Sequence, residues 1–189
     1  GVVYLSPVKE VSNILLLSQL GVVTGDILGD IITGEDNPSG KLATTWAFIN
    51  DYRFMKEFGN LDDTNYIEGV YVGYRYFNSA GIKPLYPFGF GLSYSTFEIS
   101  KKSLKNEKEE ITVEVIVKNL GKLAGKEVVQ VYVSPSQENA DKPYQSLVAF
   151  KKTPKIEGSQ EVKLSLSFNL SSIARYDEKK ASYILDNGK

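Results

Sequence analysis

Apolar and polar residues alternate with a period of two in three segments of the second half of the chain, at residues 111–117, 129–133 and 162–168. This period predicts strands with one buried face, because successive side chains of a strand point to opposite faces of its sheet. Turn-forming residues separate the segments, at 119–125, 135–143 and 153–159. Short strands that follow one another without helices predict a β-sandwich.

The beginning of the chain has a different pattern. Residues 14–17 form a short continuous apolar run, which is typical of a strand buried on both faces. Residues 24–32 repeat apolar side chains at helical spacing, so we expect a helix there. A second strand is expected over residues 41–46, after a turn at residues 37–40.

The expected helix has Thr24 as its N-cap and Gly34 at its C-terminal end. Two glycines inside it, Gly25 and Gly29, each weaken a helix by about 1 kcal/mol relative to alanine, and we expect them to permit close packing on a sheet. The predicted fold class is therefore α/β plus all-β. A partial α/β sandwich, an open sheet with helices, is followed by an immunoglobulin-like or fibronectin type III-like β-sandwich.

Aromatic residues and glycines are dense between residues 66 and 94. The rings could form a platform on which sugars stack, but the regularly interleaved glycines favour a backbone that threads tightly between two domains. We therefore predict an ordered connector. The expected division is residues 1–65 for the C-terminal part of the α/β sandwich, 66–98 for the connector and 99–189 for the fibronectin type III-like domain.

Composition excludes several classes of function. The 189 residues include no cysteine and no histidine, which rules out thiol catalysis and Ser-His-Asp arrangements in this chain, and we expect no metal and no cofactor. The formal net charge of -1 gives no field that would attract nucleic acid. The apolar run at residues 14–20 is too short to span a bilayer, so no membrane partner is expected. The lack of cysteine favours a cytoplasmic over a secreted location.

Several carboxylates could supply the acid and base of a hydrolase: Glu35-Asp36, Asp62-Asp63, Glu68 and Glu109-Glu110. Neighbouring carboxylates on loops are usually solvated, which is the prediction for each pair. Glu68 lies among aromatic residues, where a structural ion pair with Arg75 is favoured over catalysis.

Two glycine-rich segments match nucleotide-binding motifs only superficially. Leu42 stands where a phosphate-binding loop needs Ser or Thr, and five residues separate Gly34 from Gly40. The segment at 89–94 lacks the third glycine of a dinucleotide fingerprint and opens a β region. Neither predicts a nucleotide site.

Several motifs in one fixed order resemble those of glycoside hydrolase family 3, the group that contains many β-glucosidases and β-xylosidases. The resemblance covers essentially the whole chain. The motifs are Asn37-Pro38-Ser39-Gly40-Lys41-Leu42, then Glu68-Gly69-Val70-Tyr71-Val72-Gly73-Tyr74-Arg75, then Pro87-Phe88-Gly89-Phe90-Gly91-Leu92-Ser93-Tyr94, and finally Gly125-Lys126-Glu127-Val128-Val129-Gln130-Val131-Tyr132, which is similar to the family's fibronectin type III-like domain.

The resemblance implies a parent enzyme that hydrolyses terminal non-reducing β-D-glucosyl residues with retention, through an aspartate nucleophile and a glutamic acid that protonates the leaving oxygen. It places the nucleophile in an upstream barrel domain and the acid/base in an early loop of the α/β sandwich, both before Gly1. No catalytic residue is therefore expected in this chain. One departure is Val22-Val23-Thr24, where the family usually carries a Gln-Glu-Gly-like run. Family members that act on N-acetylglucosaminides through a barrel histidine seldom carry the fibronectin-like domain, so the β-glucosidase type is favoured.

The predicted function is that of a C-terminal fragment that docks on the upstream barrel domain of an enzyme acting on a β-glucoside or related oligosaccharide. Alone, the chain should be inactive. The alternative is a stand-alone carbohydrate- or protein-binding β-sandwich module, although the strands show no aromatic strip. An adhesin-type structural domain would leave the helix and the turn unexplained. We expect a truncated chain whose sandwich lacks its last strand, after one at residues 182–185, and whose exposed sheet edges favour self-association.

Overall fold

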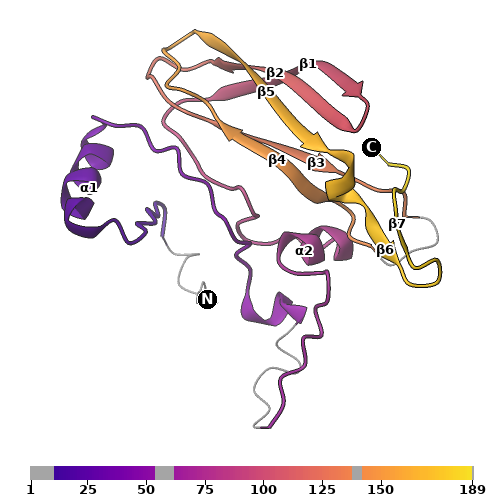
Figure 1. The fold of residues 1–189 in the computed structure, drawn as a ribbon. Helices are drawn as coiled ribbons and strands as arrows, with labels where there is room; N and C mark the ends of the chain where they lie inside the picture. Colours follow the sequence, from indigo (N-terminus) through magenta and orange to yellow (C-terminus); the bar gives the residue numbers. More distant parts are fainter. Residues whose placement is uncertain (1–10, 54–61, 138–141, 189) are drawn as a thin grey trace.

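The computed structural model describes residues 11–53, 62–137 and 142–188. Figure 1 shows two regions: the N-terminal region, residues 11–53 and 62–94, and the sandwich region, residues 97–137 and 142–188. Within these residues no helix is long and apolar enough to cross a membrane. The elements in chain order are η2 Gly21–Val23, α1 Thr24–Thr33, η3 Ile49–Asp51, α2 Tyr74–Ala80, β1 Phe97–Glu107, β2 Glu110–Asn119, β3 Val128–Val133, β4 Ser146–Lys152, β5 Glu161–Asn169, η5 Leu170–Ile173, β6 Arg175–Asp177 and β7 Ser182–Ile184.

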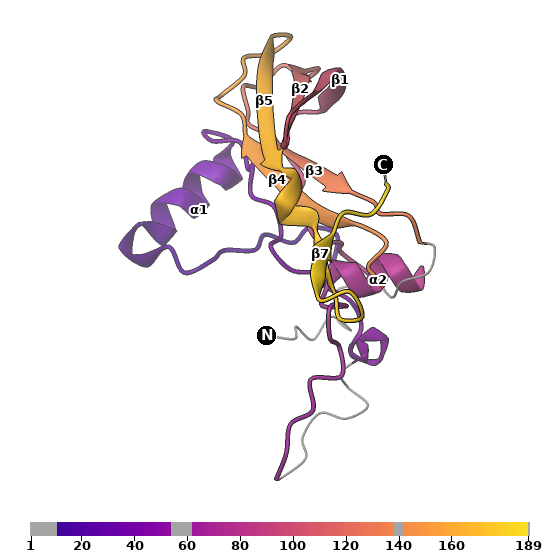
Figure 2. The same ribbon diagram turned by 45° about the vertical axis from the view of Figure 1, so that its right-hand side comes forward.

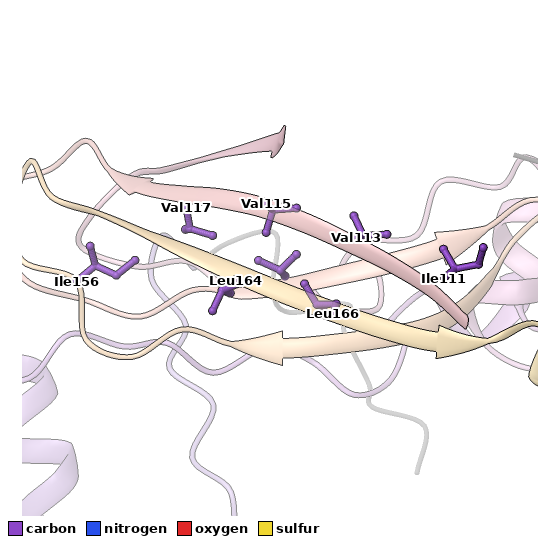
Figure 3. Packing of buried hydrophobic residues seen from close by; sticks show 8 residues of the cluster. Ile111, Val113, Val115, Val117, Ile156, Leu164 and Leu166 are labelled. Carbon is purple, nitrogen blue, oxygen red and sulfur yellow. The ribbon is translucent and has the colours of Figure 1, made fainter. Parts of the chain in front are cut away.

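The sandwich region consists of a three-stranded sheet with the order β1-β2-β5, a two-stranded sheet β3-β4 and a short hairpin β6-β7. All of these pairings are antiparallel. The apolar positions of β2 and β5 lie opposite each other, for example Val115 and Leu164. Figure 3 shows these side chains between the strands of the two sheets. The core consists of Ile111, Val113, Val115, Val117, Val129, Ile156, Leu164 and Leu166.

The strands predicted by alternation are confirmed as β2, β3 and β5, and the strand expected near residue 182 is confirmed as β7. The prediction missed β1, β4, β6 and the helix α2. Nearly every residue of β1 is exposed. Its sequence therefore carries no alternation, because neither face has to be consistently apolar.

Both strands predicted for the N-terminal region are wrong. Residues 14–17 form no strand, and Ile14, Leu15 and Leu16 are exposed. Residues 41–46 make only an isolated bridge, between Trp46 and Tyr86. A strand needs a hydrogen-bonding neighbour along its whole length. Among the described residues, 14–17 belong to no ladder, and 41–46 pair with the connector only at Leu42 and Trp46.

The predicted helix exists as α1, but its ends differ in part from the expectation. Gly34 does end it, in the left-handed conformation with φ of 82°. Thr24 is not the N-cap, because a 3-10 turn precedes it and its hydroxyl donates instead to the Gly21 carbonyl oxygen (2.7 Å). Gly25 and Gly29 face open space, so they permit no close packing on a sheet within the described residues. Figures 1 and 2 both show α1 standing apart from the sandwich.

The aromatic segment contains the short helix α2, which Gly73 precedes and Gly81 follows, both with positive φ. Phe77 is its buried residue and contacts the rings of Tyr52 and Tyr76 edge to face. The segment is thus packed around Phe77, whereas Tyr66 at its start is 91% exposed. The three domain boundaries expected from the sequence stay a prediction.

Candidate functional site: the junction between the two regions

One amide side chain joins the two regions. Asn37, in the turn after α1, donates through Nδ2 to the Ala124 carbonyl oxygen of the sandwich region (3.1 Å). Its Oδ1 accepts from the Ser93 hydroxyl (2.8 Å) and from the Tyr94 backbone N–H (2.9 Å). Gly125 lies so close that a Cβ there would be 2.7 Å from Nδ2. The asparagine therefore fixes the turn, the end of the connector and the sandwich against one another.

An ion pair lies next to this amide. Lys41 Nζ is 2.8 Å from Glu127 Oε1, and both side chains are 15% exposed. The same ammonium donates to the Gly91 carbonyl oxygen (2.7 Å). Hydrogen bonding satisfies both charges at a site with little solvent exposure, which is the condition under which such a pair contributes to stability.

The connector also pairs with the segment that follows the turn. Trp46 and Tyr86 exchange two backbone hydrogen bonds (2.8 and 2.9 Å). The Leu42 N–H donates to the Phe90 carbonyl oxygen (2.8 Å), and the Leu42 carbonyl oxygen accepts from the Gly89 N–H (2.7 Å). A Cβ at Gly91 would collide with the Gly40 carbonyl oxygen. Glycine is therefore required at this close approach of two backbone segments.

Aromatic rings complete the junction. Tyr74 of α2 packs against Phe88 (centroids 4.9 Å apart) and edge to face against Tyr132 of β3 (5.8 Å). The Tyr74 hydroxyl accepts a hydrogen bond from the Leu147 backbone N–H (2.8 Å). Burial raises the pKa of Tyr132 to about 12, so its hydroxyl stays protonated. These contacts confirm that this part of the aromatic run is packed between the two regions.

The carboxylates weighed as acid or base do not gather at the junction. Glu35, Asp36, Asp62, Asp63, Glu109 and Glu110 are all exposed, as predicted. Glu68 is half-buried, but among the described residues no ion pair links it to Arg75, so that prediction is wrong. Nor do the described residues contain a group of three His, Cys, Asp or Glu that could hold a metal. Whether the chain lacks catalytic residues stays a prediction.

Two other charged clusters stabilise the sandwich region. Hydrogen bonds from Lys163 and Ser103 lower the pKa of Glu114 on the outer face of the three-stranded sheet. The pKa of Asp186 is lowered by hydrogen bonds from Arg175 (2.7 Å) and then from Lys142 (3.0 Å). Asp186 thereby holds the β6-β7 hairpin to the loop before β4.

The N-terminal region leaves several large apolar side chains uncovered. Val11, Ile14, Leu16, Val22 and Ile32 are at least 48% exposed. A depression of about 180 Å³ is lined by Val11, Ile14, Leu16, Trp46, Phe90 and their neighbours. We call these five exposed residues, of which Val11, Ile14 and Leu16 share the depression, the open apolar face.

Sequence reasoning named the motifs of the junction but missed its contacts. The turn at 37–42 and the segment at 125–132 were recognised only as motifs of a resemblance. Nothing in their spacing indicated that Asn37 would bond to Ala124 or Lys41 to Glu127, because these partners are 87 and 86 residues apart. The need for glycine at Gly91 and Gly125 was the one readable signal of close approach.

Two family models match the chain. Residues 1–94 match the glycosyl hydrolase family 3 C-terminal domain, and residues 127–189 match the fibronectin type III-like domain. The thermostable β-glucosidase B of Acetivibrio thermocellus is 35% identical over 188 residues, which is 96% of this chain and 25% of that protein. A β-glucosidase of Ruminococcus albus is 38% identical, over 87% of this chain and 18% of that protein. The chain thus spans about a quarter or less of these relatives.

Solved structures agree with these matches. β-Glucosidase 3B of Thermotoga neapolitana superposes with a TM-score of 0.86 at 37% identity, covering 94% of this chain and 26% of that one. A family 3 β-glucosidase of Bifidobacterium adolescentis gives 0.81 at 34% identity, covering 88% and 25%. The predicted fold class, α/β followed by a β-sandwich, is therefore confirmed. The chain belongs to glycosyl hydrolase family 3, in which it corresponds to the C-terminal and fibronectin type III-like domains.

Proposed function

We propose that this chain is the structural, domain-docking part of a β-glucosidase-type enzyme that removes terminal non-reducing β-D-glucosyl residues with retention. The reaction needs a carboxylate nucleophile and a carboxylic acid about 5–5.5 Å apart. The carboxylate pairs of this chain weighed above are exposed, which is the commonest state of solvated, non-catalytic carboxylates. In this proposal both groups come from the upstream part of the enzyme.

The open apolar face is the observation that carries the proposal. Val11, Ile14 and Leu16 are exposed together around one depression, and a protein in water does not usually leave a contiguous apolar patch open unless a partner covers it. The junction with the sandwich region is already closed by Asn37, Lys41 and the aromatic rings. The open apolar face is therefore the surface on which we place the upstream domains, including the barrel domain.

A chimera tests this proposal. The matching segment of the Thermotoga neapolitana β-glucosidase is replaced by this chain, and hydrolysis of aryl β-glucosides and β-xylosides is measured. We expect the chimera to hydrolyse the β-glucoside and the chain alone to hydrolyse neither substrate. Hydrolysis by the chain alone would show that the catalytic carboxylates lie in this chain and not upstream, and would contradict the proposal.

Matched variants then locate the docking surface. Leu16 on the open apolar face and Leu120 in the sandwich region are 53% and 52% exposed. Replacement by aspartate should therefore change the free energy of unfolding of the isolated chain by a similar amount at the two positions. In the chimera, Leu16→Asp should abolish most activity because the charge is buried on docking, whereas Leu120→Asp should leave it unchanged. Equal activity of the two variants would argue against this docking surface.

A stand-alone binding module is the less favoured function, because it gives no role to the open apolar face and the relatives named above are all β-glucosidases. Self-association remains part of the proposal. The edge strand β1 carries lysines and a register shift at Lys101, which oppose pairing with another chain. β3 and β4 pair only with each other among the described residues, so we expect their free edges to mediate any association. A monomer at all concentrations in sedimentation velocity would refute this.

A further inference from the structure

The two sheets of the sandwich region differ in their number of strands. In the described residues, β4 of the two-stranded sheet contacts β5 of the three-stranded sheet, and Val129 of β3 joins the core that β2 and β5 form. Two strands cannot cover three. With β4 against β5 and β3 beside it, the strand left without cover is β1, at the edge of the larger sheet.

The face of β1 that lies on the core side is apolar and open. Directly paired residues of two strands point to the same face of a sheet. Ile99 pairs with Val117, and Leu104 pairs with Val113. The two valines are 0% and 8% exposed, whereas Ile99 and Leu104 are 48% and 57% exposed. The core therefore continues under β1 as an apolar surface that no described residue covers.

β3 has a free edge next to this surface. Alternate residues of an antiparallel strand direct their N–H and C=O to the same neighbour. The Thr153 N–H donates to the Glu127 carbonyl oxygen (2.8 Å), so Glu127 and every second residue after it turn toward β4. Val128, Gln130 and Tyr132 turn their backbone groups the other way, where no described strand pairs with them. Unlike β1, β3 carries no lysine that would oppose pairing.

The beginning of a ladder is already present on this edge. The Ser136 N–H donates to the Asn187 carbonyl oxygen (2.6 Å), and an isolated antiparallel bridge joins Pro135 to Gly188. Ser136 lies an even number of residues from Tyr132, so this bond is on the side of the chain away from β4. Figures 1 and 2 both show this last segment next to the end of β3. A strand that extended the bridge would run back along β3, under β1.

We propose that the free edge of β3 binds one further strand, antiparallel to β3, which continues the ladder from Gly188 and covers Ile99 and Leu104. This strand is amphipathic, with apolar side chains at the positions that pair with the inward valines of β3 and polar side chains between them. Backbone hydrogen bonds provide the affinity in such strand addition, and the alternate side chains provide the specificity. A second copy of the chain is the competing occupant. The inference does not rest on the proposed enzymatic function.

Two extensions of equal composition, added after Lys189 of the full chain, test the proposal. Val-Thr-Val-Thr-Val-Thr places its valines opposite Val133, Val131 and Val129, in the register of the bridge. Thr-Val-Thr-Val-Thr-Val is the control, because a shift of one residue turns every side chain to the other face. We expect the first extension to raise the urea midpoint of unfolding by about 1 M and the control to leave it unchanged.

Hydrogen exchange locates the added strand. The amide N–H groups of Val128, Gln130 and Tyr132 should exchange at least about tenfold more slowly with the first extension than with the control. The Val129 N–H, which faces β4, should change less. Equal midpoints and equal exchange for the two extensions would overturn the proposal. So would protection of the extended chain that is lost on dilution, because a second copy would then fill the edge.

A side chain under the added strand gives an independent readout. Leu104→Ala should change the urea midpoint little in the original chain, where Leu104 is 57% exposed, and lower it clearly in the chain with the first extension. Leu16→Ala, at a position 53% exposed in the N-terminal region, is the control and should have the same small effect in both. An equal effect of Leu104→Ala in both chains would mean that the strand does not lie under β1, and the proposal would be wrong.

Discussion

The sandwich region and the N-terminal region have similar numbers of apolar residues to bury but differ in where they bury them. The sandwich region encloses its own core between two sheets. In the described part of the N-terminal region only Ile31, Ala47 and Phe77 are buried apolar residues, and the open apolar face is left to solvent. The hydrophobicity of a residue therefore predicts that it is buried, but not whether the residues that cover it belong to the same chain.

The largest effect should come from one substitution made in both regions. Leu166 is 4% exposed in the sandwich core and Leu16 is 53% exposed on the open apolar face. Leu166→Ala should lower the free energy of unfolding by about 2–5 kcal/mol, because it leaves a cavity. Leu16→Ala should change it by less than about 0.5 kcal/mol. Urea denaturation of the isolated chain measures both changes. Similar values for the two variants would contradict the difference in burial between the two regions.

The junction is the next test, because it decides whether the two regions unfold together. Asn37→Ala removes the bonds to Ala124, Ser93 and Tyr94, and should cost about 1–3 kcal/mol. Asn65→Ala, at an exposed position, is the control and should have no measurable effect. Hydrogen exchange should show faster opening of the N-terminal region in Asn37→Ala. Unchanged exchange would mean that the amide does not hold the regions together.

A double-mutant cycle on Lys41 and Glu127 should show a smaller coupling. The pair is short and has little exposure, so we expect a coupling free energy on the order of 1 kcal/mol between Lys41→Met and Glu127→Gln. Lys163 and Glu114, a pair with a largely exposed lysine, provide the comparison and should couple less. A larger coupling for the exposed pair would contradict the account of the junction given above.

The smallest effect is a pH dependence confined to the sandwich region. The pKa of Asp186 is lowered by hydrogen bonds from Arg175 and Lys142, so this group stabilises the folded state above its unfolded pKa of about 3.9. That contribution is lost as the pH falls through the lower folded value. The difference in urea midpoint between wild type and Asp186→Asn should therefore be constant near neutral pH and shrink below about pH 4.

Asp62→Asn is the control for this pH dependence, because Asp62 is exposed and forms no ion pair with another described residue. Its urea midpoint should follow that of the wild type at every pH. If the urea midpoint of the wild type instead exceeded that of Asp186→Asn by more at lower pH, the direction expected from the lowered pKa of Asp186 would be wrong.

The sequence was most informative where one face of a strand is buried within the chain. β2, β3 and β5 were predicted because Val115, Val129 and Leu164 belong to one shared core. The same reasoning failed at residues 14–17, where an apolar run without a neighbouring strand stays irregular. β1 was missed for the opposite reason, since an exposed edge strand needs no apolar period.

The candidate site was predictable only as a set of motifs. The resemblance singled out the turn at 37–40 and the glycines of the connector, but contact between Asn37 and Ala124 depends on how two regions pack. Periodicity describes local structure and carries no such information. The helix α2 was missed because its seven residues are mostly aromatic or polar, and tertiary contacts around Phe77 stabilise it.

The position of Gly125 also limits how this chain could be recombined with its relatives. Asn37 contacts a backbone carbonyl oxygen, which any residue at position 124 would present. The next position is different, since any side chain there would strike the asparagine. A sandwich grafted from another member of the family should therefore fit at this joint whatever its surface sequence, provided that it brings a glycine at this point and an acidic residue two positions later.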